Sequence, residues 1–141
     1  MKQNSSATSP IPGGRKSGST DILRTLRKPY WIPVSGSSMR PLLRDGDFVL
    51  VKPLGKEDVG TIRPGMLILF VRQDVLIVHR FLGLVDGMIQ ESGDSSRDSR
   101  QIPADDLLGI VVSRKRGGIV KPVSSSFFWR LRVRLYRLTG R

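Results

Sequence analysis

The sequence contains no cysteine and, among its 141 residues, one histidine. Without cysteine the chain can form neither disulfide bonds nor thiolate sites for a metal ion. Because His79 is the only imidazole, a zinc site would depend mainly on carboxylates, which is uncommon. We therefore expect a protein that uses no metal and no other cofactor.

Long apolar runs are also absent. No stretch of the sequence approaches the roughly 18 uninterrupted apolar residues that are needed to span a bilayer. The first residues are mostly Ser, Gly, Pro and basic residues, without the apolar core of a signal peptide. The sequence thus predicts a cytoplasmic protein that has neither a signal peptide nor a transmembrane helix.

Acidic residues are few: 12 Asp and Glu stand against 24 Lys and Arg, which gives a formal net charge of +12. No acidic residue follows residue 113. In this last part of the sequence, basic residues alternate with Phe127, Leu131, Leu135 and Leu138 at helical spacing. Such a segment favours peripheral binding to an anionic membrane, here its inner face, whereas a helix packed on the core is the alternative. No motif for specific nucleic-acid recognition accompanies the charge.

Glycine and proline divide the middle of the chain into short segments. Turn signals such as Pro64-Gly65 and Asp86-Gly87 separate apolar, strand-like stretches at residues 48–52, 66–72, 75–84, 88–91 and 108–113. This pattern predicts a mainly β protein with a small, barrel-like antiparallel fold. We expect three regions: a disordered, basic N-terminal tail with room for a short helix, the β domain, and a basic amphipathic C-terminal tail, over residues 1–28, 29–116 and 117–141.

A compact polar turn, Gly36-Ser37-Ser38-Met39-Arg40-Pro41, precedes the first of these stretches. Gly36 permits a tight backbone turn, and Pro41 fixes the direction in which the chain leaves it. This geometry presents Ser38 at the bend with its own amide free to stabilise an oxyanion, although ordinary loops between strands use the same residues.

A nucleophilic serine needs a base, since its hydroxyl otherwise keeps its proton. His79 is the only imidazole available, although a lone histidine on a strand is more often structural. A carboxylate typically orients such an imidazole, and Asp94 and Asp98 in the polar stretch after residue 91 are the candidates. By default these two aspartates would be turn formers or ion-pair partners.

Together these segments resemble the signal peptidase I family and its relatives, the LexA-type self-cleaving repressors. The turn at Ser38 is similar to the nucleophile box, and His79-Arg80 to the box that carries the general base. Gly93-Asp94, followed by Asp98-Ser99-Arg100, is similar to the last box. The resemblance covers about residues 34 to 112, with the boxes in the family's order.

The resemblance implies a serine endopeptidase that hydrolyses a bond in a specific peptide or protein. Ser38 would be the nucleophile and His79 the general base, oriented by Asp98 or Asp94. A histidine in place of the usual lysine resembles the endoplasmic-reticulum and archaeal type of signal peptidase. The Ser38 amide would be one oxyanion donor, with Ser35 or Ser37 as candidates for the second. The remaining positioning residues are expected to be Gly36, Ser37, Met39 and Arg80.

Two other functions stay open at this point. A LexA-like self-cleaving regulator needs a DNA-binding domain and an Ala-Gly or Cys-Gly bond before Ser38, and the first 33 residues contain neither. A catalytically inactive module would instead bind a peptide or an acidic partner. A separation of Ser38 and His79 beyond hydrogen-bond reach would favour that alternative. The oligomeric state is not indicated by the sequence.

Overall fold

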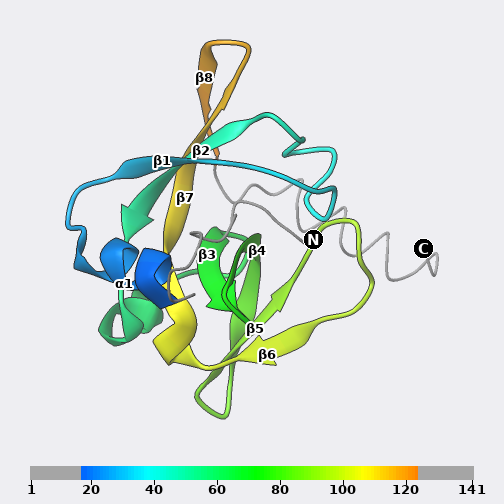
Figure 1. Ribbon diagram of the computed structural model, residues 1–141. Coiled ribbons are helices and arrows are strands. Elements are labelled where there is room, and N and C mark those ends of the chain that lie inside the picture. Colours follow the sequence, from blue (N-terminus) through cyan, green and yellow to red (C-terminus); the bar gives the residue numbers. More distant parts are fainter. Residues whose placement is uncertain (1–16, 124–141) are drawn as a thin grey trace.

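An eight-stranded antiparallel sheet organises residues 17–123, the part of the chain that the computed structural model describes (Figure 1). One α-helix, α1 (Ser17–Thr25), and two short 3-10 helices, η1 (Lys56–Thr61) and η2 (Ala104–Asp106), accompany the sheet. The strands are β1 (Tyr30–Pro33), β2 (Phe48–Pro53), β3 (Leu67–Arg72), β4 (Val75–Val85), β5 (Met88–Ser92), β6 (Arg100–Ile102), β7 (Leu107–Arg116) and β8 (Ile119–Pro122).

The strands follow the order β1-β2-β7-β3-β4-β5-β6, and β8 pairs with β7 (Figure 1). Register shifts at Leu50/Val51, Leu69/Phe70 and Phe81/Gly83 bend the strands, as β-bulges do. The prediction of a mainly β, antiparallel fold is therefore confirmed. The sheet is not a closed barrel, because β1 and β6, the first and last of the described strands in this order, do not pair with each other.

The predicted strand positions agree closely with β2, β3, β4, β5 and β7, whereas β6 and β8 had no separate signal in the sequence. Gly117 and Gly118, both with positive φ, form the turn between β7 and β8, so the boundary expected after residue 116 falls inside a hairpin. The predictions for residues 1–16 and 124–141 lie outside the described residues. Within residues 17–123, no helix has the length and apolarity required to span a membrane.

Strand β3 lies at the centre of the core. Leu67 and Leu69 belong to one buried cluster with Met39 and Val49, while the alternate residues Ile68 and Phe70 belong to a second cluster that also includes Phe81, Ile89 and Leu107. Both faces of β3 are thus covered, which explains its uninterrupted apolar sequence. Burial of each such side chain contributes about 1.5–3 kcal/mol to stability.

An ion pair between the buried Asp47 and the half-buried Arg116 joins the start of β2 to the end of β7. Asp47 is 2% exposed and accepts hydrogen bonds from Arg116 Nε at 2.8 Å and Nη2 at 2.7 Å, and from the Arg44 N–H at 2.8 Å. The hydrogen bonds from Arg116 are the main cause that holds the pKa of Asp47 below its usual value, and the Arg44 N–H acts in the same direction. Arg116 and Arg114 also donate to the Leu42 carbonyl, at 3.1 and 3.0 Å. These contacts fasten the segment that follows the Ser38 turn.

The ion pair predicts a pH-dependent contribution to stability. Because folding lowers the pKa of Asp47, its contribution is fully present above the unfolded value of about 3.9 and is lost as the pH falls through the lower folded-state value. We expect Asp47→Asn to lower the denaturant midpoint clearly at pH 7 and less at pH 3. Chemical denaturation of both proteins at the two pH values measures this, and an equal difference at both would contradict it.

Candidate active site

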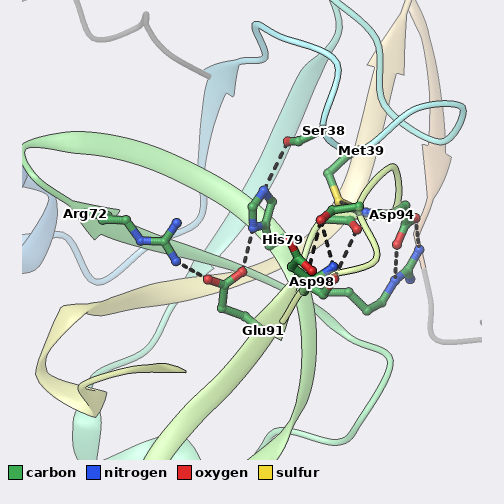
Figure 2. A network of polar contacts seen from close by, with 11 residues as sticks. Ser38, Met39, Arg72, His79, Glu91, Asp94 and Asp98 are labelled. Carbon is green, nitrogen blue, oxygen red and sulfur yellow. Dashed lines mark hydrogen bonds and ion pairs between the residues drawn. The ribbon is translucent and has the colours of Figure 1, made fainter. Parts of the chain in front are cut away.

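Ser38 and His79 lie side by side, although 41 residues separate them in the sequence. Ser38 sits in the turn between β1 and β2, and His79 projects from β4. His79 Nε2 is 3.1 Å from Ser38 Oγ, within hydrogen-bond distance (Figure 2). The imidazole is 15% exposed, so the contact is shielded but still reachable from solvent. A serine hydroxyl and an imidazole nitrogen in this arrangement can exchange a proton.

The other nitrogen of the imidazole faces Glu91, which the sequence analysis did not select. His79 Nδ1 is 2.6 Å from Glu91 Oε1, and the Glu91 side chain is 1% exposed. Arg72, at the end of β3, forms an ion pair with the second carboxylate oxygen (Figure 2). Which nitrogen of His79 donates and which accepts in these two contacts depends on the tautomer of the ring.

Asp94 does not lie against His79, contrary to one of the two expectations. Its carboxylate forms a two-point ion pair with Arg80, at 3.1 Å from Nε and 2.5 Å from Nη2. Arg80 is 4% exposed and also donates to the Gly65 carbonyl at 2.9 Å. Asp94 and Arg80 therefore hold the loop after β5 in place.

Asp98 does not lie against His79 either. It is exposed, its N–H donates to Ser96 Oγ at 3.0 Å, and its carbonyl accepts from Ser92 Oγ at 2.8 Å.

Glu91 faces His79 in place of these aspartates because Phe81 and Glu91 pair in register, and Phe81 shares a face of β4 with His79. The sequence signal that could have identified Glu91 is its position two residues after Ile89, which places both side chains on the same face of β5.

The loop after β5 binds the backbone of the Ser38 turn. The Ser95 N–H donates to the Ser38 carbonyl at 2.9 Å, and Ser95 Oγ donates to the Ser37 carbonyl at 2.8 Å. Met39 anchors the same turn in the core, where it is 4% exposed. A Cβ atom on Gly93 would stand 2.9 Å from the Ser38 carbonyl oxygen and 3.1 Å from His79 Nε2. Glycine is thus required for Ser38 and His79 to approach each other here.

Gly36 allows the tight turn that the sequence predicts, with a φ of +90° in the left-handed region. Its N–H donates to Asp45 Oδ1 at 2.7 Å, which ties the turn to the chain that enters β2. The proposed roles of Ser35 and Ser37 as second oxyanion donor stay predictions.

An apolar cavity of about 240 Å³ opens beside Ser38. Its walls come mainly from the end of β1, the Ser38 turn and the first half of β4, with one residue each from α1 and β3, and no charged side chain is among them. The apolar side chains that line it are those of Leu23, Ile32, Pro33, Val34, Met39, Leu43, Leu69, Leu76, Ile77 and Val78. Such a cavity suits an uncharged side chain of a ligand placed against Ser38.

Among residues 17–123, no group of three or more His, Asp and Glu side chains is arranged to hold a metal ion.

Comparisons with known proteins agree with this architecture. A family model described as Peptidase S24-like matches residues 3–112, a range that includes Ser38, His79 and Glu91. A search of curated proteins finds no match. Because the model covers more than half of the chain, the protein belongs to the Peptidase S24-like family, within the superfamily of LexA-like and signal peptidase-like serine peptidases.

Proposed function

We propose that this protein is a serine endopeptidase in which Ser38 is the nucleophile and His79 the general base. The observation that carries the proposal is the 3.1 Å contact between Ser38 Oγ and His79 Nε2. Membership of the Peptidase S24-like family supports a serine peptidase-like function. A separation of these two side chains beyond hydrogen-bond reach, which would have favoured the inactive-module alternative, is not observed.

In this mechanism Ser38 Oγ attacks the carbonyl carbon of the scissile peptide bond while His79 Nε2 takes its proton. The tetrahedral oxyanion is stabilised by the Ser38 N–H, with a hydroxyl of Ser35 or Ser37 as the proposed second donor. The imidazolium then protonates the leaving amine, and the acyl group stays on Ser38. A water molecule, deprotonated by His79, hydrolyses this ester and regenerates the enzyme.

The proposed substrate is an extended peptide segment with an uncharged, small to medium side chain near the cut bond. The cavity beside Ser38 supports this preference, because its walls carry no charged side chain. β5 pairs with β4 only from Arg80 onward, so the edge of β4 at residues 76–78 borders the cavity instead of another strand. A peptide could add there as a further strand. Whether the enzyme acts on signal peptides, as the endoplasmic-reticulum and archaeal enzymes do, stays a prediction from resemblance.

These two roles predict a large loss of hydrolysis when either the Ser38 hydroxyl or the His79 imidazole is removed. For a series of peptide p-nitrophenyl esters ending in Ala, Val or Leu, we expect Ser38→Ala to lower kcat/KM by roughly 10³-fold or more. We expect His79→Ala to lower it by roughly 10²–10⁴-fold, the usual contribution of a general base. Initial rates measure both effects, with the exposed Ser99→Ala as the matched control. Hydrolysis that survives in Ser38→Ala would contradict the proposal.

Gly93 lies so close to Ser38 and His79 that adding a side chain at this position is expected to lower the activity. A methyl group at this position would press on the Ser38 carbonyl and on His79 Nε2, so we expect Gly93→Ala to lower kcat by roughly 10²-fold. Gly60→Ala is the matched control, because a Cβ atom there would meet nothing within 4 Å. Ester hydrolysis and thermal unfolding of both variants are compared. If Gly93→Ala is as active as Gly60→Ala, the stated geometry of the site is wrong.

A further inference from the structure

Glu91 is a buried charge that the simple Ser38–His79 mechanism does not use. Its side chain is 1% exposed and shares its face of the sheet with buried apolar residues such as Ile89 and Phe81. A carboxylate at such a place is strongly destabilising unless donors surround it. Its polar partners come from two other strands: His79 Nδ1 from β4 and the guanidinium of Arg72 from β3. Buried ion pairs are often no more stabilising than well-packed apolar residues, so the stability of the sheet does not by itself explain this cluster.

We propose that Glu91, held by Arg72, is the positioning residue that fixes which nitrogen of His79 carries the proton. The inference rests on the proposed peptidase function, since that function gives the lone pair on Nε2 its use. Arg72 also lies 5.2 Å from the Phe70 ring centroid, and the same ring meets His79 edge-on at 5.9 Å between centroids. The guanidinium of Arg72 and the imidazole of His79 therefore both pack against the ring of Phe70.

The role of Arg72 follows from hydrogen-bond chemistry. A guanidinium only donates, so the oxygen of Glu91 that faces Arg72 must be an acceptor. The other carboxylate oxygen, which is also an acceptor, faces His79 Nδ1 at 2.6 Å. Nδ1 therefore keeps the proton, and Nε2 can take one from Ser38 Oγ. Arg72 thereby acts on Ser38 through Glu91 and His79.

The same logic makes Glu91→Gln an informative substitution. Glutamine has one acceptor oxygen and one NH₂ group, and Arg72, which only donates hydrogen bonds, can donate only to the oxygen. The NH₂ group must then face Nδ1, which becomes the acceptor, and the imidazole proton moves to Nε2. That nitrogen would point its proton at Ser38 Oγ and could not act as a base. The shape of the side chain is unchanged, so the fold is retained.

Nitrogen NMR of the full-length protein tests this directly, because His79 gives the only imidazole signals. In the unmodified protein at neutral pH we expect the proton on Nδ1, and in Glu91→Gln we expect it on Nε2. With the peptide esters we expect kcat of Glu91→Gln to fall roughly 10²–10⁴-fold, the share of general-base catalysis, with KM changed only a few-fold. Glu57→Gln, at an exposed glutamate, is the matched control.

A double variant separates positioning from mere support of the fold. In Glu91→Gln combined with Arg72→Met the amide is free to turn its oxygen toward Nδ1. We therefore expect the Nδ1 proton and part of the lost kcat to return relative to Glu91→Gln alone. A purely structural role predicts the opposite, because removing a second partner from a buried cluster would lower the activity further. Arg63→Met, at an exposed arginine, is the control for the methionine substitution.

Each outcome decides one of the two proposals. A proton on Nε2 in the unmodified protein overturns the positioning role before any variant is made. An Nδ1 proton and an unchanged kcat in Glu91→Gln overturn it as well. If the tautomer inverts as expected but the unmodified protein hydrolyses none of the esters, the peptidase function is wrong and the positioning of His79 by Glu91 stands.

Discussion

The burial of the Glu91 carboxylate is the constraint on which the site depends. A charge that is 1% exposed needs donors, and β3 and β4 supply them as Arg72 and His79. The antiparallel register of β3, β4 and β5 brings these residues to one face of the sheet. Because the carboxylate accepts from Nδ1, Nε2 is free to meet Ser38 Oγ at 3.1 Å. The electrostatics of one buried group thus set the orientation and the tautomer of the base.

The Ser38 turn is held by contacts that do not involve Arg72, Glu91 or His79. Met39 inserts into the core, and the loop of residues 93–95 binds the turn from behind. Arg80 fixes that loop through Asp94, and Asp47 with Arg116 fixes the segment that leads into β2. Two of the acidic residues buried in the described part of the chain therefore serve the placement of Ser38 rather than its chemistry. The loop can approach Ser38 and His79 this closely because Gly93 has no side chain, for which there would be no room.

Much of this could be predicted from local sequence patterns, and the remainder depended on pairing between strands. Short apolar stretches between glycine- and proline-containing turns were enough to predict β2, β3, β4, β5 and β7. The Ser38 turn and the single histidine could be found as motifs. The partner of His79 could not, because the register of β4 against β5, and not spacing along the chain, places Glu91 opposite Phe81. Asp94 looked suitable by sequence, but it follows the end of β5, where Arg80 binds it.

The central claim is that His79 makes Ser38 nucleophilic, and labelling with a fluorophosphonate tests it most directly. The reagent phosphonylates an activated serine hydroxyl with loss of fluoride, and peptide mapping by mass spectrometry locates the adduct. The account predicts one adduct, on Ser38, with the neighbouring Ser35 and Ser37 unmodified. The absence of an adduct at neutral and alkaline pH, or an adduct on another serine, would contradict it.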